Sequence, residues 1–397
     1  MKLASRVGRI APSPTLAMAA TAKAMAAQGI DVIDFSTGEP DFDTPEAVKS
    51  AAEAAIRAGF TKYTPSSGTE ELRGAVVDKL QRELGLRYEK SQVLISCGAK
   101  HSLYNVAEAL LEAGDEIIIP TPYWVSYSDQ ALLNDATAVL LPTSEKDGYA
   151  IHAAELERLV TPRTKAIIVN SPCNPTGATY GRATLEAIAA IALRHDLLVI
   201  SDEIYEKIIY DGTVHISIAT LGTDIAARTI IINGVSKAYA MTGWRIGYAA
   251  GPRDLIAAMG NIQSQSTSNP CSISQKAAVA ALRDGDDFTA RMVVEFDQRR
   301  RVIVEGLNGI RGVSCRMPTG AFYAFPNVSG VLGRRGPDGV VKTPTDLANY
   351  LLKTAHIAVV PGEPFGSQAH VRLSYATGMD TIKRGLERLD NALAQLT

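Results

Sequence analysis

The sequence predicts an α/β protein built around a mostly parallel β-sheet, with a second, smaller α+β unit. Its 397 residues exceed what one ordinary hydrophobic core accommodates, which indicates two domains. Short β-branched runs alternate with longer Ala/Leu/Glu-rich stretches through the middle of the chain. These runs are almost continuously apolar, which is typical of strands that are covered on both faces.

Seven apolar runs predict the strands of one sheet, with helices between several of them on both faces. We expect strands at 92–96, 116–120, 138–142, 165–170, 197–201, 229–233 and 246–251. We expect helices at 101–113, 183–195 and 252–263. In sheets of this kind, functional side chains lie at the carboxyl ends of the strands and in the loops that follow.

The character of the sequence changes after about residue 285. A long charged helix is expected at 287–307, followed by a helix at 345–355, a strand at 357–361 and a final helix. We therefore predict a large domain at 46–286. The N-terminal segment 1–45 and the C-terminal part 287–397 are expected to form the small domain together.

Composition and charge exclude several functions. With 40 basic and 42 acidic residues, the net charge of −2 gives no basic surface for nucleic acid or an anionic membrane. The Ala-rich N-terminus is interrupted at Pro12 and Pro14, unlike a signal peptide, and no run is long enough to span a bilayer. Four dispersed cysteines predict a reduced, cytoplasmic protein, and six scattered histidines provide no metal-binding motif.

Three predicted strands end on groups that can bind a ligand. Gly98 and Ala99 lie between a strand and a helix, where backbone N–H groups can hold a phosphate; a tight turn is the alternative. Asn174 lies in the stiff segment SPCNPTG, which can also be a simple turn. Asp202 ends an apolar strand, either as a buried anion that needs a cationic partner or as a helix N-cap.

A fourth strand end is the most informative. Lys237 follows the run at 229–233, where burial lowers the pKa of an amine and favours the neutral form that Schiff-base chemistry requires. Arg245 can offer a bidentate fork to a phosphate, and the Ser236 hydroxyl adds a further donor.

One cofactor uses all of these groups. Pyridoxal phosphate has an aldehyde for a lysine, a ring nitrogen for a carboxylate, a phenolic oxygen for polar donors and a phosphate for N–H and guanidinium groups. The glycine patterns that bind NAD or ATP are absent from the sequence.

The motifs, in their order along the chain, resemble those of the class I (fold type I) aminotransferases. From about Ser13 to the C-terminus, the chain is most similar to the short subgroup of bacterial aspartate aminotransferases. The motifs are FSTGEPDFDTP, TKYTPSSGTEELR, SCGAKHSLYN, PTPYWVSY, VNSPCNPTG, SDEIYE, NGVSKAYAMTGWRIGY, PTGAFY and HVRLSYAT. The resemblance implies the pyridoxal-phosphate-dependent transferase fold of type I, with a seven-stranded sheet. It also implies a ping-pong transfer of the amino group of L-aspartate to 2-oxoglutarate.

The resemblance also implies roles around the cofactor ring. Lys237 is expected to hold the cofactor as a Schiff base and to move the substrate proton, and Asp202 to pair with the ring nitrogen. Asn174 and Tyr205 are expected to bind the phenolic oxygen, while Trp124 stacks on the ring.

The resemblance further implies which residues bind the phosphate of the cofactor. The implied phosphate ligands are Gly98, Ala99, Ser236, Arg245 and Tyr63. Tyr63 is expected to reach the phosphate of a neighbouring subunit, which implies a homodimer.

The substrate is expected to be held at both of its ends. Arg372 and backbone at Gly38 are implied for the α-carboxylate, with Trp124 and Asn174 bordering the substrate. Lys100 is implied for the distal carboxylate, with Ser13 and Thr15 closing over it; a solvated lysine is the alternative for Lys100. Relatives often have K-P-S-x-T where this chain has Ala11 before Pro12, which puts prephenate activity in doubt.

Other functions on the same scaffold stay open at this point. They are an aminotransferase for aromatic or neutral amino acids or prephenate, a pyridoxal phosphate lyase acting at Cβ or Cγ, and a cyclopropane-forming synthase. Stimulation of turnover by an added 2-oxo acid separates transamination from the last two. A regulator that binds the cofactor or an amino acid as a signal is a non-enzymatic alternative, but the sequence has no basic segment for DNA.

Overall fold

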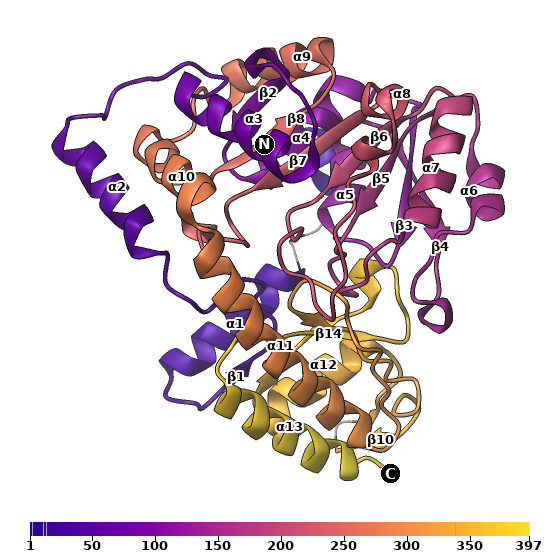
Figure 1. Cartoon of the computed structure of the whole chain (residues 1–397). Coiled ribbons are helices and arrows are strands. Elements are labelled where there is room, and N and C mark those ends of the chain that lie inside the picture. Colours follow the sequence, from indigo (N-terminus) through magenta and orange to yellow (C-terminus); the bar gives the residue numbers. More distant parts are fainter. Residues whose placement is uncertain (2, 11, 13, 338) are drawn as a thin grey trace.

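The computed structural model describes residues 1, 3–10, 12, 14–337 and 339–397, and it consists of two parts (Figure 1). One part surrounds a seven-stranded sheet, and the other contains the C-terminal helices together with the first strand of the chain. No helix in the described ranges has the length and apolar character needed to cross a membrane.

The central sheet has the strand order β2-β8-β7-β6-β5-β3-β4. Its strands are β2 (Val93–Ser96), β3 (Glu116–Thr121), β4 (Thr137–Pro142), β5 (Thr164–Asn170), β6 (Leu198–Asp202), β7 (Thr229–Gly234) and β8 (Gly247–Ala250). All pairs are parallel except those of β8, which is antiparallel to β2 and β7. The predicted mostly parallel sheet of seven strands is therefore confirmed.

Helices cover both faces of this sheet because its strands are apolar on both sides. The helices of this part are α2 (Glu46–Arg57), α3 (Glu70–Leu84), α4 (Ala99–Leu110), α5 (Ser126–Leu133), α6 (Ala153–Leu159), α7 (Arg182–Arg194), α8 (Thr223–Ala226), α9 (Arg253–Ser266) and α10 (Ser272–Asp284). Side chains of α4, α5 and α9 pack with one face, for example with Leu94 and Ile168. Side chains of α2, α3 and α10 pack with the other face around Ile95, and those of α6 and α7 do so around Ile167.

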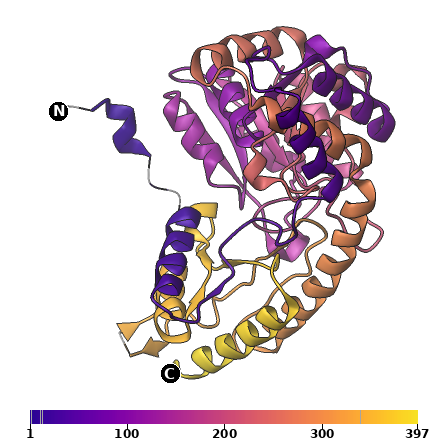
Figure 2. The ribbon, with the colours of Figure 1, turned by 90° about the vertical axis from the view of Figure 1, so that its left-hand side faces the viewer.

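The second part is built from the N-terminal and the C-terminal segments of the chain. Its helices and strands are α1 (Pro14–Ala27), β1 (Ile33–Asp34), α11 (Asp286–Gly309), β9 (Tyr323–Ala324), β10 (Arg335–Gly336), β11 (Gly339–Val340), α12 (Pro344–Ala355), β12 (Ile357–Ala358), β13 (Val360–Pro361), β14 (Val371–Ser374) and α13 (Met379–Ala394). Strand β1 pairs with β12, so the N-terminal segment lies against the C-terminal part. Figure 2 shows α11, in orange, running from the large part into the smaller one.

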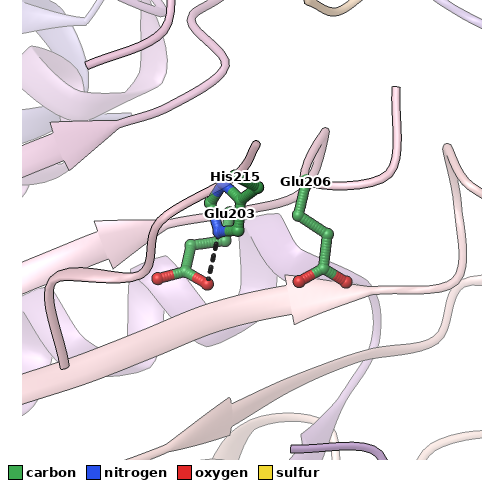
Figure 3. A group of neighbouring side chains, drawn as sticks. All are labelled: Glu203, Glu206 and His215. Carbon is green, nitrogen blue, oxygen red and sulfur yellow. Dashed lines mark hydrogen bonds and ion pairs between the residues drawn. The ribbon is translucent and has the colours of Figure 1, made fainter. Parts of the chain in front are cut away.

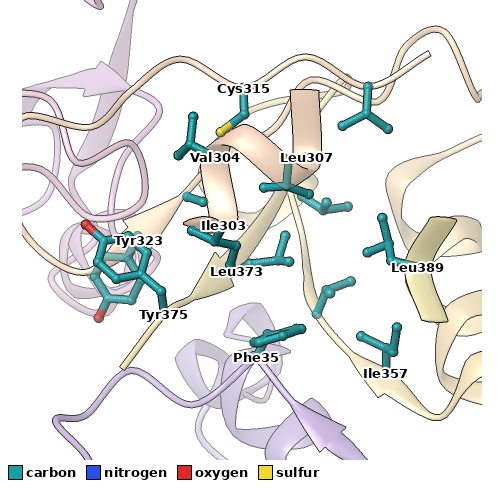
Figure 4. Close-up of a cluster of buried hydrophobic side chains, with 14 of the residues drawn as sticks. Phe35, Ile303, Val304, Leu307, Cys315, Tyr323, Ile357, Leu373, Tyr375 and Leu389 are labelled. Carbon is teal, nitrogen blue, oxygen red and sulfur yellow. The ribbon is translucent and has the colours of Figure 1, made fainter. Parts of the chain in front are cut away.

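The strand expected at 357–361 forms two short strands with different partners. Strand β12 pairs with β1, whereas β13 belongs to the three-stranded antiparallel sheet β13-β14-β9. A buried cluster that includes Phe35, Ile303 and Leu373 forms the core beneath these strands (Figure 4). The domain limits at 46–286, 1–45 and 287–397 stay a prediction.

Short 3-10 helices complete the connections. They are η1 (Ser5–Arg9), η2 (Lys90–Gln92), η3 (Glu145–Asp147), η4 (Ile218–Leu221), η5 (Thr242–Trp244) and η6 (Glu363–Phe365).

Candidate active site

A pocket of about 510 Å³ lies at the carboxyl ends of the central strands, within the size range of small-molecule sites. Asp202 ends β6, and Lys237 lies three residues after β7. The pocket brings together most of the residues that the sequence singles out. These lining residues are Thr15, Gly38, Ala99, Lys100, Trp124, Asn174, Asp202, Tyr205, Ser236, Lys237, Arg245 and Arg372.

The amine of Lys237 lies at the floor of this pocket. Its Nζ donates a hydrogen bond to the carbonyl oxygen of Gly38 at 2.6 Å. Burial lowers the pKa of Lys237 to about 8, an effect that the carboxylate of Glu39 opposes and the guanidinium of Arg372 reinforces. A substantial fraction of the side chain is therefore the neutral, nucleophilic amine near neutral pH.

Asp202 presents a buried carboxyl group to the same space, with only 4% of the residue exposed. Tyr127 Oη donates to its Oδ2 at 2.6 Å, and the backbone N–H of Ile204 donates to its Oδ1 at 3.3 Å. Burial raises the pKa of Asp202 to about 6, against the lowering effect of the Tyr127 hydrogen bond. A cation placed beside this carboxyl favours its ionised form.

The other end of the pocket combines a helix N-terminus with a guanidinium group. Helix α4 begins at Ala99 directly after Gly98, whose φ of +88° suits glycine. A Cβ on Gly98 would lie 2.4 Å from Nη2 of Arg245, and a Cβ on Gly247 would lie 2.2 Å from the backbone nitrogen of Ala99. The two glycines thus let Arg245 and the start of α4 approach one another closely, which makes an anion-binding corner.

Arg372 reaches the pocket from β14 with 2% of the residue exposed. Its Nη2 donates to the carbonyl oxygen of Ser36 at 2.7 Å, and its Nη1 donates to Oδ1 of Asn174 at 3.0 Å. Its Nε is buried and has no hydrogen-bond partner among the described residues. The contacts that Arg372 makes with the described residues are to a carbonyl, an amide and aromatic rings, and none is an ion pair with an acidic side chain, so its charge is available to an anionic ligand.

Lys100 and Thr15 line the mouth of the pocket. Lys100 Nζ lies 4.8 Å from the centre of the Trp124 ring, and burial together with Arg245 lowers the pKa of Lys100. Thr15 comes from α1, which packs near β1 and β12 in the smaller part. The two sides of the mouth therefore belong to different parts of the fold.

Three predicted residues differ from this pattern. Tyr63 is 92% exposed and does not line the pocket of its own chain. Gly98 contributes to the corner by its backbone beside Arg245 and is not itself part of the lining. Ser13 lies outside the described residues, so its predicted role stays a prediction.

Sequence reasoning missed three residues that bind, or act electrostatically on, predicted site residues. Tyr127 binds Asp202, Glu39 influences the pKa of Lys237, and the Tyr323 hydroxyl lies 2.7 Å from that of Tyr205. All three lie within the motifs PTPYWVSY, FSTGEPDFDTP and PTGAFY. A tyrosine three residues after Trp124 was the available signal for the first of them.

A separate acidic group lies beyond Asp202 along the chain (Figure 3). Glu203, Glu206 and His215 place their possible metal-ligand atoms within 4.8 Å of one another. However, His215 Nε2 lies 3.1 Å from Glu203, and Lys79 Nζ donates to Glu206 at 2.5 Å. Both carboxylates already face a basic side chain, so this group is an internal ion-pair cluster.

Comparison with known proteins identifies the family. The model of the family described as aminotransferase class I and II matches residues 30–389. The chain belongs to this family. Its arrangement of a seven-stranded sheet with a pocket at the strand ends is thus that of a class I and II aminotransferase.

Individual aminotransferases match almost the whole chain. The aspartate aminotransferase of Rhizobium meliloti (strain 1021) is 48% identical over 396 residues, 99% of this chain and 97% of the relative. The aspartate/prephenate aminotransferase of Nitrosomonas europaea is 44% identical over 397 residues, 99% of this chain and 100% of the relative.

Solved aminotransferase structures agree with the fold. The crystal structure of the aspartate aminotransferase from Rhizobium meliloti has a TM-score of 0.96 at 48% identity, with 100% of both chains covered. That of the Thermus thermophilus aspartate aminotransferase with maleate has a TM-score of 0.93 at 40% identity, covering 99% of this chain and 100% of the other.

Proposed function

We propose that this aminotransferase uses pyridoxal phosphate to move the amino group of L-aspartate to 2-oxoglutarate in a ping-pong reaction. The observation that carries the proposal is one pocket that holds Lys237, with a pKa lowered to about 8, the buried carboxyl of Asp202, and the guanidinium of Arg372, which has no acidic partner among the described residues. Full-length relatives named aspartate aminotransferase support the choice of substrate.

The pocket residues fit the cofactor at its phosphate end. The N–H groups that begin α4 and the Arg245 guanidinium offer donors and positive charge to a phosphate. The Ser236 hydroxyl lines the same pocket and is a further donor. The close approaches at Gly98 and Gly247 are a specific sequence requirement for this corner.

The residues also fit the ring of the cofactor. When bound, pyridoxal phosphate supplies an electrophilic aldehyde and an electron-accepting ring. Lys237 offers the amine for the aldehyde, and Asp202 offers a carboxylate for a protonated ring nitrogen. Trp124 offers a flat surface for stacking, and Asn174 and Tyr205 offer polar groups for the phenolic oxygen.

A dicarboxylic amino acid matches two cations that line the pocket, Arg372 and Lys100. Arg372 provides a fork for the α-carboxylate, because its Nε is unpartnered in the described chain and each Nη has a second N–H. Lys100 at the mouth provides a charge for the distal carboxylate, with Thr15 next to it.

Lys237 is proposed as the base that moves the proton from Cα. Its neutral form is accessible because burial lowers its pKa, and proton transfer by a positioned base contributes about 10²–10⁴-fold to a rate. Asp202 is buried, which limits the access of water to its carboxyl group.

We also propose a cytoplasmic homodimer. The ring of Tyr63 projects into solvent, 92% exposed, which suits a residue that serves a neighbouring subunit's phosphate site. The four cysteines are unpaired, the state expected in a reducing compartment.

Prephenate is a second candidate amino acceptor. Two relatives named aspartate/prephenate aminotransferase are 44% and 45% identical to the chain over its whole length, almost as similar as those named for aspartate alone. Ala11, where relatives often have lysine, lies outside the described residues. Measuring kcat/KM with prephenate as the amino acceptor tests this candidate.

A steady-state assay tests these choices. We expect L-aspartate with 2-oxoglutarate to give the highest kcat/KM, and Lys100→Ala to lower that value about tenfold while changing the value for an aromatic amino acid less than twofold. A preference for aromatic or neutral donors would refute the assignment of Lys100. Turnover that needs no 2-oxo acid would indicate a lyase or synthase instead.

A further inference from the structure

A buried tyrosine contacts both the cofactor side and the substrate side of the pocket. Tyr323 lies in β9 with 1% of the residue exposed, and it lines the pocket. Its hydroxyl lies 2.7 Å from that of Tyr205, which is 4% exposed and follows the end of β6. This contact joins the smaller part of the fold to the central sheet.

The same ring supports the guanidinium of Arg372. The central carbon of that guanidinium lies 4.5 Å from the centre of the Tyr323 ring and 5.2 Å from that of Phe365. Arg372 is buried and its charge has no acidic partner in the described ranges, so contact with an aromatic face helps to offset the loss of water.

The backbone opposite Tyr323 leaves no room for a side chain. A Cβ on Gly38 would lie 2.6 Å from the Tyr323 hydroxyl, and the carbonyl oxygen of Gly38 accepts the hydrogen bond from Lys237. Tyr323 is therefore held between the Gly38 backbone, Tyr205 and Arg372. These contacts fix the position of the Tyr323 hydroxyl beside that of Tyr205.

We propose that Tyr323 is a positioning residue with two separable functions, its hydroxyl acting on Tyr205 and its ring acting on Arg372. The inference rests on the proposed function, because it assigns Tyr205 to the cofactor's phenolic oxygen and Arg372 to the substrate. When Tyr205 donates its proton to the cofactor, Tyr323 donates to the oxygen of Tyr205. A phenol that accepts a hydrogen bond is a stronger donor, so Tyr323 strengthens the hold of Tyr205 on the phenolic oxygen.

Two substitutions separate the two functions. Tyr323→Phe removes the hydroxyl and keeps the ring, whereas Tyr323→Leu removes both. Tyr375→Phe is the matched control, because Tyr375 belongs to the same buried cluster, is 0% exposed and does not line the pocket (Figure 4). Its hydroxyl donates to the carbonyl oxygen of Ala321 at 3.1 Å, so the control also removes a buried hydrogen bond.

The first measurement is a pH titration of the absorbance of the cofactor-loaded protein. Weaker donation by Tyr205 stabilises the deprotonated chromophore less, so we expect Tyr323→Phe to raise the pH midpoint by about 0.5–1 unit. We expect Tyr375→Phe to leave the midpoint at the wild-type value. The second measurement is the Kd of maleate, a dicarboxylate without an amino group, which should rise about tenfold in Tyr323→Leu and stay within twofold in Tyr323→Phe.

The functions of the Tyr323 hydroxyl and of the Tyr323 ring are tested independently. Equal midpoints in wild type and Tyr323→Phe would overturn the function of the hydroxyl, as would an equal rise in Tyr375→Phe. Unchanged maleate affinity in Tyr323→Leu would overturn the function of the ring. Wild-type protein that takes up no cofactor would overturn the proposed function, and this inference with it.

Discussion

Replacing Arg372 by leucine should strongly lower kcat/KM while leaving the thermal stability nearly unchanged. The proposed clamp loses two charge-assisted hydrogen bonds to the substrate carboxylate, each worth roughly 1.5–3 kcal/mol. A combined loss of about 4 kcal/mol corresponds to a fall in kcat/KM of about 10³-fold, since about 1.4 kcal/mol is a factor of ten.

The stability of the Arg372→Leu variant should change little. The substitution removes hydrogen bonds to Ser36 and Asn174, but it also relieves the burial of a guanidinium that has no acidic partner in the described chain. Burial lowers the pKa of Arg372, so holding its charge here is unfavourable. These effects oppose each other, and we expect Tm to change by less than about 3 °C.

Arg300 provides the matched control because it is also fully buried, at 0% exposure. It pairs with Asp297 at 2.5 Å and with Asp211 at 2.8 Å, away from the pocket. Arg300→Leu leaves both carboxylates without this partner, so we expect a loss of roughly 2 kcal/mol in stability and a lower Tm. The kcat/KM of the folded Arg300→Leu protein should equal that of wild type.

The assays are aspartate transamination at limiting substrate and thermal unfolding without a dicarboxylate. A fall in kcat/KM of less than tenfold in Arg372→Leu would refute the clamp. A Tm more than about 10 °C below wild type would show that the buried charge of Arg372 stabilises the fold, contrary to the prediction.

Four further predictions concern separate features of the molecule. For the cofactor-free protein, the rate of cofactor uptake should rise about tenfold per pH unit below the Lys237 pKa of about 8 and level off above it, as followed by absorbance; a flat profile would contradict the reactive neutral amine. Asp202→Asn should lower kcat about 10²–10³-fold in the transamination assay, because an uncharged amide supports a ring cation poorly. Burial disfavours the charged form of His215, yet the Glu203 carboxylate raises its pKa, so its stabilising effect is present below about pH 6.5 and is lost as pH rises through the folded pKa; His215→Gln should flatten this part of a Tm–pH curve. Coexpression of the Tyr63→Ala and Lys237→Ala variants should give higher activity than either variant expressed alone, because a mixed dimer contains one intact site. No gain in activity would place Tyr63 outside the partner's site.

The sheet could be predicted from the sequence because its strands are buried on both faces. Continuous apolar runs marked all seven strands, and the groups at their carboxyl ends converge as strand parallelism requires. The smaller part was harder to predict, since its strands are two to four residues long and several of them pair with distant segments. The run at 357–361 gave no local sign that it divides between two sheets.

The site could be predicted where a motif fixes a backbone position, and less well where side chains from distant segments meet. Lys237 and Asp202 follow strands directly, so their location was inferable. The hydrogen bonds from Tyr127 to Asp202, from Arg372 to Ser36 and between Tyr205 and Tyr323 join residues 75, 336 and 118 positions apart. Periodicity contains no information on such contacts, which depend on how the two parts pack.

The most direct test of the central claim is a single half-reaction, followed by absorbance on the purified, cofactor-loaded protein. L-Aspartate alone should convert the absorbance of the lysine-bound cofactor to that of the amino form, and 2-oxoglutarate should then restore the original spectrum. Lys237→Ala should show neither change at a comparable rate. A wild-type spectrum that L-aspartate leaves unchanged, in protein that holds the cofactor, would contradict the account of this pocket as an aspartate aminotransferase site.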